Sequence, residues 1–154
     1  MSNFKFSLSR LLEMRDEAVK QCDIELQKAR SICVKLNEML ATERDFYLSE
    51  RDELNEKMRR AEIAAIGMYE GSLDTRKKRM IEILSSLRAA RDDVDLAEQN
   101  LIQARRDQHV LENLRARRKS EFDLAEEEKE RKFLDEQATM RYQRRLALDL
   151  KKGS

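Results

Sequence analysis

Proline and tryptophan are absent from this 154-residue sequence, which has three glycines and an aromatic content of only 5%. Without proline, the commonest helix breaker is missing, so long helices are not interrupted. No apolar run approaches the ~20 residues that span a bilayer, and charges at Lys5 and Arg10 interrupt any signal peptide. These absences argue against a mixed fold, a membrane span and secretion, so we expect a soluble, all-α, cytoplasmic protein.

Residues for catalysis are also scarce. His109 is the only histidine, no glycine-rich phosphate loop occurs, and no set of metal ligands converges in the sequence. Acidic residues such as Glu126–Glu128 are expected on a solvated helix face, which lacks the pocket needed to shift their pKa values. We therefore expect no catalytic residue, no metal site and no cofactor, and we predict that the protein is not an enzyme.

Charge, by contrast, is abundant and nearly balanced. Charged residues make up 41% of the chain, with 32 basic and 31 acidic side chains and a net charge of +1. Glutamate, lysine and arginine favour helices, and the balance gives no argument for nucleic-acid binding. The basic runs Arg76–Arg79 and Arg115–Lys119 are interpreted as solvated helix faces; contact with nucleic acid or an anionic membrane is the alternative.

Apolar residues recur every seven positions in both halves of the chain, which is the pattern of a coiled coil. In the first half one line is apolar throughout, and a second line begins apolar but becomes charged. A third line widens the stripe. The first line is Leu12, Val19, Leu26, Cys33, Leu40, Tyr47, Leu54, Ala61 and Met68; the second runs from Leu8 to Ala64 through Arg15, Cys22, Glu43, Glu50 and Lys57; the third includes Leu11, Ala18, Ile32, Met39 and Phe46.

The second half repeats the pattern up to Leu111 and then loosens. Its two lines are Leu73, Met80, Leu87, Val94 and Leu101, and Ile83, Ala90, Ala97, Ala104 and Leu111. The charged residues on the seam have two interpretations: they select the register of the helices, or their side chains extend to solvent. Cys22 and Cys33 lie on the seam too far apart to bond to each other, so we expect buried, reduced thiols.

Two of the three glycines lie between the halves, close to Ser72, Asp74 and Thr75. Glycine ends helices, and serine or aspartate begins them. The sequence therefore predicts one coiled-coil domain over residues 1–154. Its fold is an antiparallel hairpin of two long helices, at about 5–66 and 76–150, joined by a turn at about 67–75. A turn centred on Gly71 would bring Glu50 near Arg91, and one centred on Gly67 would bring Glu43 there.

Three segments resemble the flagellar FliJ family. They are the opening Asn3-Phe4-Lys5-Phe6-Ser7-Leu8-Ser9-Arg10-Leu11-Leu12-Glu13-Met14-Arg15, the stretch from Val110 to Arg118 with Phe122 after it, and Leu134-Asp135-Glu136 followed by Arg141. The resemblance covers nearly the whole chain. One departure is Arg76, which stands where the family has leucine. This departure allows a turn about ten residues earlier, around 58–65.

The resemblance implies a component of the flagellar type III export apparatus. Such proteins are two-helix coiled coils similar to the stalk subunit of rotary ATPases. The implied partners are a hexameric export ATPase, the cytoplasmic part of the export gate and export chaperones. Association with the inner membrane would occur through these partners only, without nucleic acid. An injectisome stalk protein and a structural coiled-coil scaffold are the alternatives.

The resemblance also suggests which end of the hairpin meets which partner. We expect the open end to enter the ATPase ring, with Arg10, Leu11 and Arg15 on one helix and Arg131, Leu134, Asp135 and Arg141 on the other. The half near the turn would contact the gate through Phe46, Tyr47, Met80 and Leu84. Because Phe46 and Tyr47 are adjacent, only one can fill the seam. The other either presents an aromatic ring to a partner or merely widens the core stripe.

Overall fold

The computed structural model describes residues 2–153; residues 1 and 154, the ends of the predicted domain, lie outside it. Across this range two α-helices and no strand form: α1, Ser9–Arg59, and α2, Ile63–Lys152. The all-α prediction is confirmed. The chain divides into two compact units, residues 15–106 and residues 1–14 with 107–154, which are described in turn. That the whole chain forms one domain stays a prediction.

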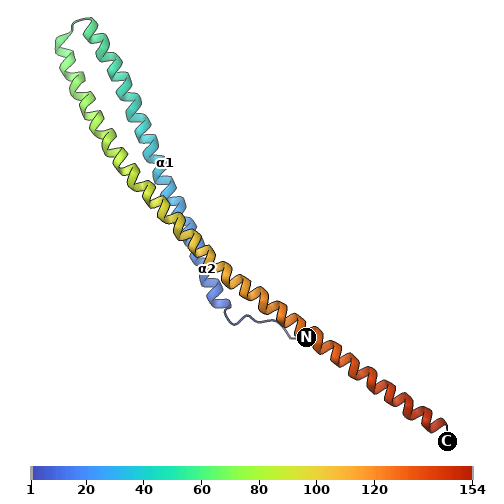
Figure 1. Cartoon of the computed structure of the whole chain (residues 1–154). Coiled ribbons are helices and arrows are strands. Elements are labelled where there is room, and N and C mark those ends of the chain that lie inside the picture. The colour runs from blue at the N-terminus through green and yellow to red at the C-terminus, as the bar shows by residue number, and fades with distance from the viewer. Residues whose placement is uncertain (1, 154) are drawn as a thin grey trace. The chain divides into compact units, whose positions relative to one another are not determined.

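In residues 15–106 the two helices run side by side in opposite directions as a hairpin (Figure 1). The predicted seam forms its core. Each buried leucine contributes roughly 1.5–3 kcal/mol through the apolar surface it removes from water. Alanines between the leucines allow the helices to approach closely. The buried seam residues of this unit are Leu26, Leu54, Leu73, Leu87, Ala90, Leu101 and Ala104.

The turn that joins the helices is built without glycine. Ala61 adopts a φ of 55°, which is a left-handed conformation that glycine usually supplies at a helix end. The amide of Ala61 donates to the carbonyl of Met58 (3.1 Å), and the amide of Glu62 donates to that of Lys57 (3.1 Å). These two bonds satisfy the last carbonyls of α1 in a Schellman motif. The Lys57 ammonium also pairs with the Glu62 carboxylate at 2.9 Å and fastens the same turn.

The prediction of a turn at 67–75 is therefore wrong, and so are the helix limits that depended on it. Gly67 and Gly71 lie inside α2, and the turn occupies residues 60–62. Glycine lowers helix stability without preventing a helix, and here the packing of the seam on both sides of these residues outweighs that cost. The earlier position that the FliJ resemblance allowed, around 58–65, contains the observed turn.

Exchanging alanine and glycine between the turn and the helix should stabilise the protein. An added Cβ would meet nothing within 4 Å at Gly67 or Gly71, so alanine there should gain about 0.5–1 kcal/mol each. Ala61→Gly should gain a similar amount, about 0.4–1 kcal/mol, by removing the strain of a positive φ. Urea unfolding followed by circular dichroism measures the gain. Gly153→Ala, at the end of α2, is the control and should change little.

The pairing of the two helices is symmetrical about Ala61. Tyr69 bonds to Glu53, and Ser72 bonds to Glu50, in each case at equal sequence distances from that residue. The prediction that Glu50 or Glu43 lies near Arg91 is wrong, because it assumed a later turn. A turn moved by about ten residues shifts every cross-helix pair by about twice that number.

Two of the three predicted apolar lines on α1 lie at the seam. The third line is exposed: Ile32, Met39 and Phe46 have 53%, 52% and 52% of their surface accessible. The stripe therefore has the two-line width of a coiled coil rather than the broader face of a globular helix. Cys22 and Cys33 are free and only partly buried, whereas the sequence predicted buried thiols. That they are reduced stays a prediction.

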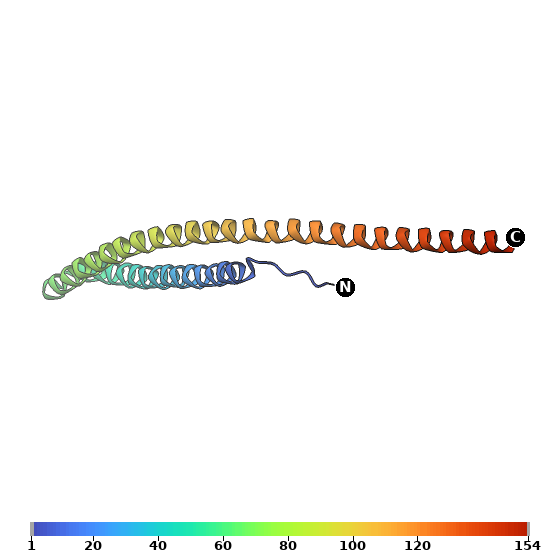
Figure 2. The ribbon, with the colours of Figure 1, turned by 90° about the horizontal axis from the view of Figure 1, so that it is seen from below.

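In the second unit a non-helical segment precedes α1 and runs beside α2 (Figure 2). Phe4, Phe6 and Leu8 alternate with polar residues, so an extended backbone turns all three to the same side. Phe6 is buried in a small core with Leu12 and Leu111, and the other two pack against it. We call residues 2–8 the N-terminal strap.

Beyond the strap, α2 continues as an exposed helix. Every residue from 127 to 152 is helical and exposed, including the large apolar side chains of Phe133 and Met140. High contents of glutamate, lysine, arginine and alanine support such a helix locally. Pairs such as Lys132 with Glu128, at 3.6 Å and four residues apart, add to that support.

Candidate partner-binding surfaces

Two kinds of feature are absent from residues 2–153: a group of side chains that could hold a metal ion, and a helix that could span a membrane. No group of three or more histidine, cysteine, aspartate or glutamate side chains in this range could hold a metal ion. Among the described helices, none is long and apolar enough to cross a membrane.

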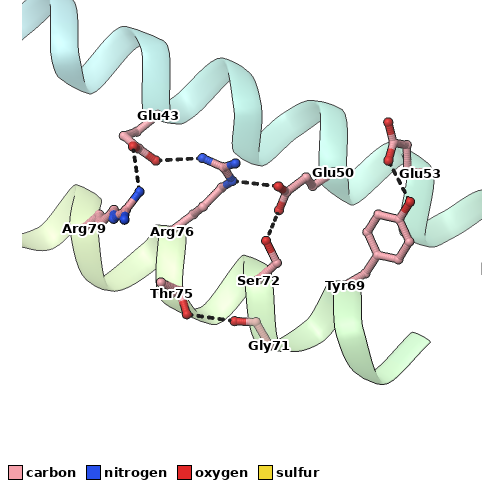
Figure 3. Close-up of polar contacts among 9 residues, drawn as sticks. All are labelled: Glu43, Glu50, Glu53, Tyr69, Gly71, Ser72, Thr75, Arg76 and Arg79. Carbon is pink, nitrogen blue, oxygen red and sulfur yellow. Dashed lines mark hydrogen bonds and ion pairs between the residues drawn. The ribbon is translucent and has the colours of Figure 1, made fainter. Parts of the chain in front are cut away.

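Three charged residues meet on the seam near the turn (Figure 3). Arg76 donates from Nε to Oε1 of Glu50 (2.8 Å) and from Nη1 to Oε2 of Glu43 (3.1 Å). The side chains are only 21%, 20% and 17% exposed, in that order. Ser72 donates a further bond to Glu50 at 2.7 Å. We call Glu43, Glu50 and Arg76 the seam ion cluster.

For Glu43 and Glu50, the seam ion cluster bears on the two interpretations of charged seam residues. One guanidinium bridges two carboxylates that lie one heptad apart along α1, so a slip of either helix by one turn breaks at least one bond. Arg76, the departure from the family's leucine, is the partner that Glu43 and Glu50 require. These contacts favour the first interpretation, in which charged seam residues select the register of the hairpin.

Electrostatics within the cluster are consistent with its geometry. The hydrogen bond from Ser72 lowers the pKa of Glu50, and the bond and positive charge of Arg76 lower it further against the opposing effect of desolvation. The same contacts raise the pKa of Arg76, first through its bond to Glu50. At neutral pH Glu50 and Arg76 are therefore charged.

Acidification should weaken the hairpin through Glu50. Because its folded-state pKa lies below the ordinary value of a glutamate, its contribution to stability is present above that ordinary value. The contribution is lost as pH falls through the folded-state pKa. We expect the melting temperature of Glu50→Gln, measured by circular dichroism, to fall less between pH 7 and pH 3 than that of the wild type. The slope of melting temperature against pH is the quantity compared. Glu56→Gln, an exposed control, should keep the wild-type slope; equal slopes for wild type and Glu50→Gln would contradict the prediction.

The aromatic pair expected to meet the export gate lies beside this cluster. Phe46 is 52% exposed, whereas Tyr47 is partly buried at the seam, so Phe46 is the ring that faces outward. The guanidinium of Arg76 lies 4.8 Å from the centre of the Phe46 ring, and the Lys77 ammonium lies 5.7 Å from that of Tyr47. Such cation–π contacts hold an exposed ring in one orientation.

The two α2 residues predicted with that pair differ in exposure. Met80 is partly buried, one turn beyond Arg76 on the seam. Leu84 is 51% exposed and one turn further along α2. Phe46 and Leu84 are therefore the members of this set that a partner could reach.

All four residues of the first basic run contact their own chain. Arg76 and Lys77 make the contacts given above, Lys78 pairs with Asp74 at 3.3 Å, and Arg79 pairs with Glu43 at 3.6 Å. In the second run, Arg118 lies 5.7 Å from the Phe6 ring centre. These contacts favour the interpretation of both runs as helix faces.

The residues expected to enter the ATPase ring fall in two separate places. Arg10 and Leu11 lie at the start of α1, where neighbouring Leu12 packs with Leu111 of α2. Arg131 is twenty residues beyond Leu111, which is roughly 30 Å along a helix. The structure does not bring the two sets together, because the earlier turn shifts the pairing along α2. Arg15 is partly buried, and Leu134, Asp135 and Arg141 are exposed on the stretch after residue 126.

The contacts of the N-terminal strap were not predicted, because the first helix was expected to begin near residue 5. Phe4 packs against Phe122 with ring centres 5.6 Å apart. Arg118 donates to the Ser7 hydroxyl at 2.9 Å, and the Ser2 hydroxyl donates to Glu126 at 2.8 Å. The signal was present in the alternation of Phe4, Phe6 and Leu8, a period of two rather than seven.

Taken together, these features define a two-helix coiled-coil protein with exposed helix surfaces. The family model described as flagellar FliJ protein matches residues 4–147, and the chain belongs to this FliJ family. The family is a non-catalytic component of flagellar protein export. No curated protein and no solved structure shows a significant match to the chain.

Proposed function

We propose that this protein is a non-enzymatic stalk of the flagellar type III export apparatus. In this proposal it acts in the cytoplasm at the inner membrane, enters the ring of a hexameric export ATPase, and links that ring to the export gate and to export chaperones. One observation supports the proposal most. A single FliJ-family chain contains both a hairpin with the seam ion cluster and an exposed helical stretch, residues 127–152.

The division of the chain suggests how the two tasks are separated. A stalk must keep its own helices in register while a ring contacts it repeatedly, and the seam ion cluster supplies that register. The contacts with the ring are assigned to exposed charged and apolar residues of both helices: Arg10 and Leu11 at the start of α1, and Arg131, Leu134, Asp135 and Arg141 of α2. Exposed ion pairs contribute only about 0–1 kcal/mol each, which suits contacts that form and break.

The gate contact is assigned to the half of the hairpin near the turn. Phe46 is a large exposed ring held by Arg76, and Leu84 is an exposed apolar side chain on α2. Aromatic anchors of this kind contribute much of the energy of protein interfaces. The flagellar family model favours a flagellar system over an injectisome. A structural scaffold predicts self-association instead.

The decisive experiment is a binding assay of two variants against the export ATPase and against the cytoplasmic part of the gate. Arg10→Glu combined with Arg141→Glu should weaken ATPase binding about tenfold or more and leave helicity unchanged, since both residues are exposed. Phe46→Ala should spare ATPase binding and weaken the gate contact about tenfold.

A control variant and two contrary outcomes complete the design. Met39→Ala removes a side chain as exposed as Phe46, on the same face of α1, and should affect neither partner. The opposite pattern in the two variants would mean that the hairpin is docked the other way round. Failure of the wild-type chain to bind either partner, together with a dimeric mass, would favour the scaffold.

A further inference from the structure

The last three turns of α2 carry an unusual concentration of positive charge. Residues 141–152 contain five basic residues and one acidic residue, a net charge of +4, whereas the whole chain has +1. The rest of the chain is therefore net negative. All twelve residues are exposed. These turns are the most basic surface of the exposed stretch after residue 126.

This segment is also amphipathic. Tyr142, Leu146 and Leu150 follow one another at intervals of four and line one side of the helix. They are 63%, 45% and 76% exposed. Basic side chains lie on the flanks and far side of the helix at 100° per residue: Arg141, Arg144, Arg145 and Lys152. Leu148, 59% exposed, lies on the far side as well.

The geometry of the apolar side favours a flat partner over a helix. A partner helix in a coiled coil requires two apolar lines at alternating intervals of three and four. Here the position three after Leu146 is Asp149, and the position three before it is Gln143. A single apolar row on a helix whose other sides carry arginines instead fits the boundary between lipid headgroups and acyl chains. There the leucines enter the acyl region, and the tyrosine hydroxyl stays among the headgroups.

Charge identifies the kind of lipid. A cluster of lysine and arginine beside an apolar row is attracted by the negative surface potential of a membrane that contains anionic lipids. Long basic side chains reach the phosphates while their methylene groups lie along apolar surface. A nucleic acid could bind the same charges, but it would leave the row of Tyr142, Leu146 and Leu150 in water.

We propose that residues 141–152 of α2 bind directly to the surface of an anionic membrane. This differs from the expectation that the chain reaches the membrane through protein partners only. It goes beyond the stalk function and does not depend on it, because binding to a membrane requires neither the ATPase nor the gate. Arg141 is assigned to both surfaces, so this end of α2 would meet the ring and the membrane in turn and not together. A chain held in this way would be concentrated on the membrane surface in two dimensions.

The test is co-sedimentation of the full chain with vesicles. Vesicles of phosphatidylglycerol and phosphatidylethanolamine should bind it at least about tenfold more tightly than vesicles of phosphatidylcholine. Rising salt should weaken the binding, since screening shortens the range of the attraction. The triple variant Tyr142→Ser, Leu146→Ser and Leu150→Ser should lose about tenfold or more in affinity. The double variant Arg144→Glu and Arg145→Glu should lose as much.

Leu148→Ser is the matched control, because it removes the same kind of exposed side chain from the same turns but on the far side. It should change binding less than about twofold. Circular dichroism checks that each variant stays helical. Equal binding to neutral vesicles, no binding to anionic ones, or an effect of Leu148→Ser as large as that of the triple variant would overturn the proposal. Binding of duplex DNA that the triple variant leaves unchanged, without vesicle binding, would assign the charges to nucleic acid and also overturn it.

Discussion

Replacing Arg76 with glutamate is expected to lower the melting temperature by on the order of 10 °C. The variant places a third carboxylate beside Glu43 and Glu50, which are already four-fifths buried at the seam. Three negative charges there repel one another and lose their only shared cation. Thermal unfolding by circular dichroism measures the effect.

Two further variants separate the role of Arg76 from a general effect of charge. Arg79→Glu reverses a neighbouring charge whose side chain is 61% exposed, so it should cost much less. Glu50→Arg in the Arg76→Glu background restores an opposite-charge pair and should recover part of the loss. An Arg79→Glu variant as unstable as Arg76→Glu would show that the seam contacts are not the cause.

Shortening Leu87 to alanine should destabilise the hairpin by about 2–5 kcal/mol. Leu87 is 2% exposed, so its removal leaves a cavity in the seam as well as losing buried apolar surface. Leu84 lies one turn away on α2 and is 51% exposed. Leu84→Ala should cost less than about 0.5 kcal/mol. Urea unfolding of the two variants measures the difference directly.

The same pair of variants separates folding from binding. Leu84→Ala should weaken the proposed gate contact while the protein stays folded, because Leu84 is in the set assigned to the gate. Leu87→Ala should reduce stability before it affects any particular partner. Similar stability losses in both variants would mean that Leu84 is covered in solution.

The sequence was sufficient to predict the seam because a seven-residue repeat reports directly which side of a helix is buried. Leu26, Leu87 and Leu101 were predicted at the seam and are among the most buried side chains. The repeat carries no information about where the chain reverses, since it continues through the turn. Ala61 occupies a conformation that glycine usually adopts, so the search for glycine led to the wrong place.

Two further features were beyond a search for helix periodicity. The N-terminal strap depends on Phe4 and Phe6 meeting residues more than a hundred positions away, and such pairs follow only from the correct register. The members of the seam ion cluster were identified in the sequence, but their contact was not predicted. Glu43 and Glu50 were charged residues on the seam, and Arg76 was a departure from leucine. Because the assumed turn separated them along the hairpin, their complementarity was not apparent.

The position of the seam ion cluster has a consequence for how the protein folds. Its bonds join residues 26 and 33 positions apart, among the short cross-helix separations in the hairpin. Closing a short loop costs less chain entropy than closing a long one, so contacts near the turn form early. A chain that begins to pair in a slipped register therefore meets unmatched charges within its first few turns and comes apart again. We therefore expect mispaired hairpins to dissociate before the apolar residues further along the seam have packed.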